Sequence, residues 1–128
     1  MGITVKSKID ELNIPFDYKS FIHLLAEKIS ENDNIEKIYL FGSCAVGKVT
    51  DRSDIDFAII VNDKTPADRN FRLDIINKIE DLLMERESAI NIPYEVVFFN
   101  RIDFERNKGV SISVVKDIER KGEVLYER

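Results

Sequence analysis

The sequence predicts an α/β domain built on a small mixed β-sheet, with helices packed mainly on one face. Three apolar runs, Glu36–Phe41, Ile55–Val61 and Tyr94–Phe99, are rich in the β-branched and aromatic residues typical of strands. Two longer segments, 17–31 and 65–87, repeat apolar residues at helical spacing. Because no internal repeat, low-complexity tract or linker interrupts these patterns, residues 1–128 are expected to form a single domain.

Length, composition, net charge and cysteine content limit the classes of protein to which this chain can belong. The chain has 128 residues, 44% of them hydrophobic and 34% charged, as in ordinary soluble globular domains. Its net charge of −5 argues against extended binding of nucleic acid. A single cysteine, Cys44, excludes an internal disulfide and favours a cytoplasmic location. No apolar run reaches the roughly 18–20 residues of a membrane span, so no membrane association is expected.

The N-terminal third predicts a short helix, a long helix and a strand. Residues 7–12 could form a helical turn that Pro15 ends. Asp17 is the expected N-cap of a helix running to about Glu31. One face of this helix is apolar and is expected to enter the core, with His23 off that face and on the surface. The apolar residues are Phe21, Leu24, Leu25 and Ile29. A turn at 32–34 then leads into the first strand.

The second long helix should begin at Thr65, with Pro66 in its first turn, and run to about Glu87. Its core face is expected to hold five aliphatic residues: Ile75, Ile76, Ile79, Leu82 and Leu83. Pro93 ends the region, and the third strand follows it.

The C-terminal part is less regular. Residues 103–108 are consistent with a helical turn, which Gly109 ends. Residues 111–121 predict a helix with Val114, Val115 and Ile118 inward and Gly122 as the residue that follows its last turn. The alternation of Val110, Ile112 and Val114 permits the start of a strand instead. Residues 123–126 form a short extended segment.

The strongest functional signal joins the first two strands. Gly42-Ser43 follows the first strand, and Asp54-Ile55-Asp56 opens the second after ten intervening residues. Side chains at alternate positions of a strand share one face, so Asp54 and Asp56 can aim at one point. Two carboxylates about 5 Å apart repel by roughly 3 kcal/mol at an effective dielectric of 20, which a divalent cation would remove. A Gly-Ser bend with free amide groups can hold a phosphate beside them.

Other polar residues have competing explanations. Glu95 is an acid in an apolar strand, and it either ligates an ion or faces water at a sheet edge. Cys44 lies where a helix could begin, a setting that can activate a thiol, but packing of a small residue near the loop is the favoured explanation. Asp51 is expected to be solvated. A Cys44–His23 nucleophile pair has no support in the sequence.

Residues 42–47 followed by 53–56 resemble the signature of the minimal nucleotidyltransferases, which belong to the DNA polymerase beta-like nucleotidyltransferase superfamily. The resemblance implies the nucleotidyltransferase fold, and it places catalytic and metal-ligating roles on Asp54, Asp56 and Glu95. It implies two Mg²⁺ ions, with Mn²⁺ as a possible substitute. Nucleotide-binding roles fall on Gly42, Ser43, Lys48 and Ser53. Two departures stand out. The family often carries arginines after Gly-Ser, whereas this chain has Cys44 and Val46, and Glu95 replaces a common aspartate.

The resemblance further implies transfer of a nucleoside monophosphate, AMP from ATP, to a hydroxyl acceptor. Small relatives often act as antitoxins, so the implied acceptor is a HEPN-type toxin protein. Two alternatives stay open from the residues alone. One is a non-catalytic antitoxin or interaction module that retains the fold, and the other is a metal-dependent phosphohydrolase that uses the same carboxylates.

Overall fold

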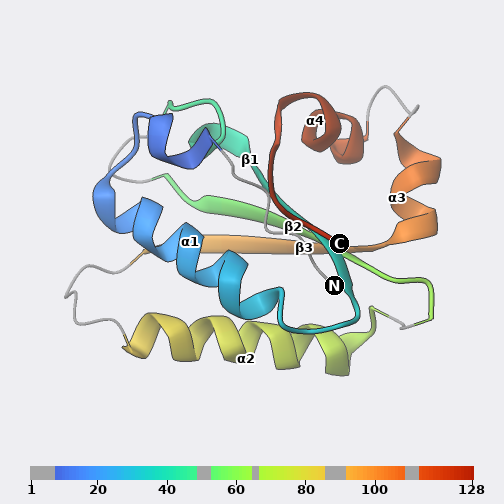
Figure 1. The fold of residues 1–128 in the computed structure, drawn as a ribbon. Coiled ribbons are helices and arrows are strands. Elements are labelled where there is room, and N and C mark those ends of the chain that lie inside the picture. Colours follow the sequence, from blue (N-terminus) through green and yellow to red (C-terminus); the bar gives the residue numbers. More distant parts are fainter. Residues whose placement is uncertain (1–7, 49–52, 65–66, 86–91, 109–112) are drawn as a thin grey trace.

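The computed structural model describes residues 8–48, 53–64, 67–85, 92–108 and 113–128. Within these ranges a mixed sheet of four strands runs in the order β3-β2-β1-β4 (Figure 1). The strands are β1 (Ile35–Phe41), β2 (Ile55–Val61), β3 (Tyr94–Asn100) and β4 (Glu123–Glu127). Strand β1 is antiparallel to β2 and β4, whereas β2 and β3 are parallel. The predicted sheet is confirmed and gains one strand, because the extended C-terminal segment pairs with β1.

Helices cover both faces of the sheet unequally. The two long helices, α1 (Phe16–Ile29) and α2 (Arg69–Glu85), pack on one face as predicted, together with the short 3-10 helix η1 (Lys8–Glu11) (Figure 1). Their side chains join alternate residues of β2, such as Phe57 and Ile59, in the larger core. The short helices α3 (Arg101–Asn107) and α4 (Val114–Lys121) pack on the opposite face around Tyr39 and Phe104.

Both long helices start differently from the prediction. Helix α1 begins at Phe16 after Pro15, whose φ of −57° and ψ of 146° lead directly into the helix, so Asp17 lies in the first turn and is not the N-cap. The expected cap at Thr65 and Pro66 lies outside the described residues. Asp68 instead accepts a hydrogen bond from the backbone N–H of Phe71 at 3.0 Å, which caps α2. The predicted end of α2 at Glu87 also lies outside the described residues.

Helix α4 corrects one prediction of burial. Ser113 caps it by accepting a hydrogen bond from the N–H of Val115 at 3.1 Å. Val115 and Ile118 are buried as predicted, but Val114, the first residue of the helix, is 46% exposed. The strand alternative at 110–112 lies outside the described residues.

Gly122 ends α4 with extended backbone geometry, φ −75° and ψ 154°, so it is the C-cap and lacks the expected left-handed conformation. Its lack of a side chain matters because a Cβ there would collide with the carbonyl oxygen of Ile118 and would lie 3.1 Å from that of Leu40. The end of α4 therefore sits directly against β1. Across the described part of the chain, no helix is both long and apolar enough to cross a membrane.

Candidate active site

The first two predicted acids lie at the start of β2. Along this strand Ile55, Phe57, Ile59 and Val61 enter the larger core, whereas Ala58 and Ile60 join the smaller core under α3 and α4. Asp56 shares the direction of Ala58, so it faces the side of the sheet that the short helices only partly cover. Asp54 stands one residue before the strand and is exposed.

The third predicted acid lies beside them. Glu95 pairs with Asp56 in the parallel register of β2 and β3, and paired strands lie about 4.8 Å apart. Val97 and Phe99, at alternate positions after Glu95, pack in the smaller core, which places Glu95 on the same face as Asp56. The structure thus brings Asp54, Asp56 and Glu95 to one end of one face. Because β3 is the last strand on its side of the described sheet, Glu95 borders open solvent.

The three acids carry like charges that no ion pair among the described residues compensates. Burial, followed by the negative charges of Glu95 and Asp54, raises the pKa of Asp56 to about 6. Within the described residues, no lysine, arginine or histidine forms an ion pair with any of the three acids. A cation bound here would remove the repulsion and favour the ionised form of Asp56.

The carboxylates of Asp54, Asp56 and Glu95 are suitable ligands for a hard divalent ion. Carboxylate oxygens are the ligands that Mg²⁺ prefers. In the described ranges, however, no three Asp, Glu, His or Cys side chains already form a group that could hold an ion. Magnesium usually takes one or two carboxylates together with phosphate oxygens of a substrate, so the arrangement suits an ion held jointly with a bound nucleotide.

The bend after β1 is fitted closely to Asp56. Gly42 opens the 3-10 helix η2 (Gly42–Cys44) with φ +76°, in the left-handed region that favours glycine. A Cβ on Gly42 would overlap the Oδ2 atom of Asp56. The N–H of Lys48 then donates to the carbonyl of Ser43 at 2.9 Å and closes the loop. Ser43 is half-buried and directly follows Gly42, and its predicted role in binding a phosphate stays a prediction.

Two contacts anchor the backbone that carries Asp54. The thiol of Cys44 is buried and donates to the carbonyl oxygen of Asp54 at 3.5 Å, and the hydroxyl of Tyr18 donates to the carbonyl of Ser53 at 3.0 Å. Burial raises the pKa of Cys44 to about 11, with further contributions from the charges of Asp56 and Asp54, so the thiol is neutral and not an activated nucleophile.

Two other polar residues of interest lie away from these contacts. The Nε2 atom of His23 lies 2.9 Å from Asp10 Oδ1 on the surface, and no contact joins it to Cys44. Asp51 lies outside the described residues.

A cavity of about 530 Å³ adjoins the bend. Gly42 and Lys48 line it, and Phe41 and Val46 lie beside them. Its far wall was not predicted and consists of Val114, Asp117 and Lys121 from α4. That wall depends on the pairing of Leu40 with Glu123, which draws the end of α4 onto β1. No local pattern encodes this long-range contact.

Comparison with solved structures shows a shared fold. The chain resembles, in fold, a chain of the crystal structure of a toxin–antitoxin with AMP-PNP, at 21% identity and a TM-score of 0.51, covering 83% of this chain and 73% of that one. A weaker likeness, at 20% identity and a TM-score of 0.44, joins it to a chain of the tri-AMPylated Shewanella oneidensis HEPN toxin in complex with MNT antitoxin, covering 84% and 73%. No curated protein matches.

A family model described as polymerase beta, nucleotidyltransferase matches residues 24–128, which include β1, the Gly42 bend, all three acids and α4. The match spans most of the chain. The protein therefore belongs to the polymerase beta nucleotidyltransferase family.

Proposed function

We propose that this protein transfers AMP from ATP to a hydroxyl group of a partner protein. One observation carries the proposal: Asp54, Asp56 and Glu95 stand together on one face, without a compensating cation in the described residues, next to a glycine bend that admits no side chain. Such a group of acids is costly for folding and suits a site that binds metal and polyphosphate together.

Each residue has a proposed role. Asp54, Asp56 and Glu95 would hold two Mg²⁺ ions, or Mn²⁺ in their place. The bound ions supply charge neutralisation on the phosphates and a lower pKa for the acceptor hydroxyl. Gly42 lets the polyphosphate approach the backbone, and Ser43 donates a hydrogen bond to it. Lys48 and Ser53 flank the nucleotide.

Glu95 suits the acceptor side of the reaction. Its carboxylate lies on the edge strand β3, away from the Gly42 bend, with Asp56 between the two. A hydroxyl group that approaches over this edge could pass its proton to Glu95 while its oxygen attacks the α-phosphate and pyrophosphate leaves on the Gly42 side. Positioning and charge neutralisation would then supply most of the rate.

The acceptor is proposed to be a HEPN-type toxin, which makes this protein the antitoxin of a pair in the cytoplasm. A solved structure that this chain resembles in fold contains a toxin and an antitoxin with AMP-PNP, and another contains an AMPylated HEPN toxin. The family-level resemblance therefore supports a protein acceptor, and the open β3 edge leaves room for one.

A non-catalytic antitoxin is the second candidate. Two points favour it: Glu95 stands where the family resemblance implies an aspartate, and the described residues contain no ready three-ligand metal group. In this case the protein would bind its partner without modifying it.

The test is a transfer assay with ATP labelled on the α-phosphate, Mg²⁺ and a HEPN-type toxin as the candidate acceptor. Covalent label on the partner, lost in Asp56→Asn and Glu95→Gln variants, is the expected result. Tight binding of the partner without label in the wild-type reaction would overturn the transfer proposal and favour the binding module. Release of inorganic phosphate in place of pyrophosphate would indicate hydrolysis instead.

A further inference from the structure

The cavity beside Gly42 has two walls that come from distant parts of the chain. Val46 and Lys48 stand on the wall formed by the bend after β1, and α4 forms the other wall. Phe41 lies between them, paired with Asp56 across the sheet. The cavity and Glu95 are therefore on opposite sides of Asp56, and a molecule in the cavity would reach the acids from the β1 side.

Helix α4 presents two different faces. Val115 and Ile118 bury themselves against the sheet. Val114, Asp117 and Lys121 follow one another at spacings of three and four residues, so they form a single stripe along the cavity. Val114 is 46% exposed and Val46, on the facing wall, is 47% exposed. The cavity thus offers one uncovered apolar side chain from each wall, which suits the flat face of a nucleobase.

The end of the stripe opposite Val114 carries the positive charge of Lys121. Neither Lys48 nor Lys121 forms an ion pair within the described residues, although Asp117 lies one helical turn from Lys121. Gly122 fits against the carbonyl of Leu40, so Lys121 belongs to the end of α4 that abuts β1 and the Gly42 bend. Two lysines without an ionic partner among the described residues therefore line the cavity together with Gly42.

We propose that α4 is the second wall of the nucleotide site, in which Lys121 and Lys48 neutralise the polyphosphate while Val114 and Val46 hold the base. The inference rests on the proposed function and adds residues to it. It accounts for the residues 44–48, which carry no arginine, because the missing positive charge comes from α4.

The stripe also sets the direction of the bound nucleotide. Val114 lies seven residues from Lys121, or roughly 10 Å along a helix. Asp117 stands between them, where it would repel phosphate and accept hydrogen bonds from a ribose hydroxyl or a base amine. The polyphosphate is thereby directed to the Lys121 end, beside Gly42 and Asp56, and the base to the Val114 end.

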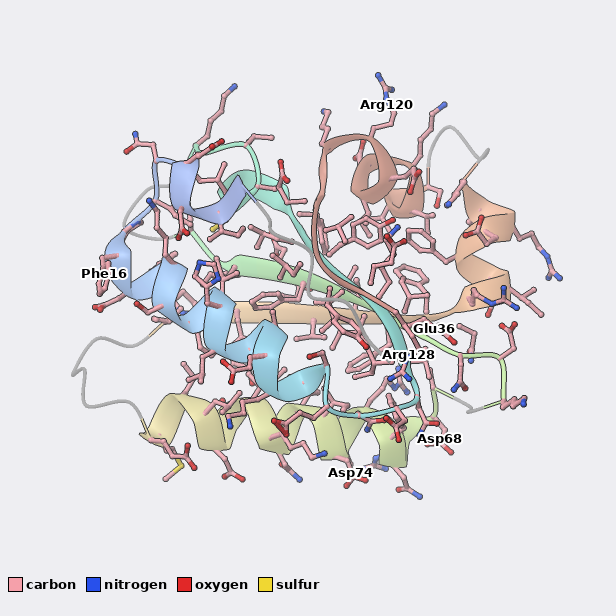
Figure 2. All side chains as sticks on the ribbon, viewed as in Figure 1. Phe16, Glu36, Asp68, Asp74, Arg120 and Arg128 are labelled. Atoms are coloured by element: carbon pink, nitrogen blue, oxygen red, sulfur yellow. The ribbon has the colours of Figure 1, made fainter. Side chains whose placement is uncertain are left out.

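The test is calorimetric titration of the full chain with three probes in Mg²⁺ buffer: ATP, tripolyphosphate and AMP. Lys121→Ala should weaken ATP and tripolyphosphate by about tenfold or more and AMP by less than about threefold, because the lost contact is to the outer phosphates. The double variant Val46→Ala/Val114→Ala should weaken ATP and AMP by roughly fivefold and leave tripolyphosphate unchanged. Arg120→Ala is the matched control: Arg120 is the neighbouring base on α4, does not line the cavity and projects away from the helix (Figure 2).

The outcomes separate the two proposals. If the wild type binds ATP and Lys121→Ala binds ATP and tripolyphosphate equally well, the role of α4 is overturned while the transfer proposal stands. If the wild type binds none of the three probes, both proposals fail. Lys121→Arg should retain most of the affinity, and a melting curve of each variant verifies that the fold is intact.

Discussion

Asp56 and Glu95 occupy paired positions on the parallel strands β2 and β3, on one face of the sheet, and no basic side chain of the described residues pairs with either. Burial and the charges of Glu95 and Asp54 together raise the pKa of Asp56 to about 6. Adjacent like charges in a partly buried position lower the stability of the fold. Their presence indicates a site whose favourable partner is a bound cation.

Replacement of Asp56 by asparagine should therefore stabilise the protein at neutral pH. The folded-state pKa of about 6 exceeds the ordinary value of 3.8, so the folded protein binds this proton more tightly than the unfolded chain does. The stabilisation from this proton is complete below about pH 4 and is lost as the pH rises through 6. After allowance for solvent screening, Asp56→Asn should exceed the wild type by about 1–2 kcal/mol at pH 7.5.

Urea unfolding of both proteins at pH 4 and pH 7.5, in the absence of metal, measures this difference. The advantage of the variant should shrink as the pH falls. An equal difference at both pH values would show that Asp56 is not destabilised by its ionisation.

Gly42→Ala should destabilise the fold more than Gly47→Ala does. Both glycines have positive φ, +76° and +72°, so each substitution carries backbone strain of about 1 kcal/mol. At Gly47 the nearest atom to an added Cβ is 3.7 Å away, whereas at Gly42 the Cβ would collide with Asp56. We expect an additional loss of about 1–3 kcal/mol at Gly42 alone. Equal melting temperatures for the two variants would contradict the close fit of Gly42 against Asp56.

The fold was largely predictable because its strands carry strong local signals. The bounds of β2 match the sequence expectation at both ends. Helix starts were less predictable because several residues compete for one cap: Pro15 displaced Asp17, and Asp68 caps α2 three residues after the expected Thr65. The exposure of Val114 was missed because one short helix can turn either apolar edge inward.

The residues of the candidate site also differ in whether local sequence alone could place them. Asp54 and Asp56 share a face by the alternation of a strand, which depends on local sequence alone. The approach of Glu95 to Asp56 required the parallel register of β2 and β3, and the family resemblance supplied that expectation. Lys121 and the rest of the α4 stripe were not predicted, because their position follows from the pairing of β4 with β1.

Cys44 should be unreactive in the folded protein. The thiol is fully buried, and its pKa is raised to about 11, so little thiolate exists at pH 8. Alkylation by iodoacetamide at pH 8 should be slow in native buffer and rapid in urea, as mass spectrometry would record. Cys44→Ala should keep transfer activity. Rapid native alkylation that also abolishes activity would instead assign Cys44 a chemical role.

Asp68→Ala should cost about 1 kcal/mol of stability, because Asp68 accepts the 3.0 Å hydrogen bond from Phe71 that caps α2. Asp74→Ala, on an exposed position within the same helix, is the control and should change stability by less than about 0.5 kcal/mol (Figure 2). Both variants replace an aspartate by alanine, and only Asp68 caps the helix. The difference between their free energies of unfolding, measured by urea denaturation, therefore gives the contribution of the cap. Equal losses in both variants would argue that general helix charge, and not the cap, is responsible.

The central claim is that Asp54, Asp56 and Glu95 bind divalent metal together with a nucleotide. The most direct test is electron paramagnetic resonance of Mn²⁺ titrated with the protein in the presence of ATP, because it needs no partner protein and no turnover. The wild type should remove the free Mn²⁺ signal beyond what ATP alone removes, and Asp56→Asn and Glu95→Gln should each weaken this binding by about tenfold or more. Wild-type Mn²⁺ binding in both variants would contradict the account.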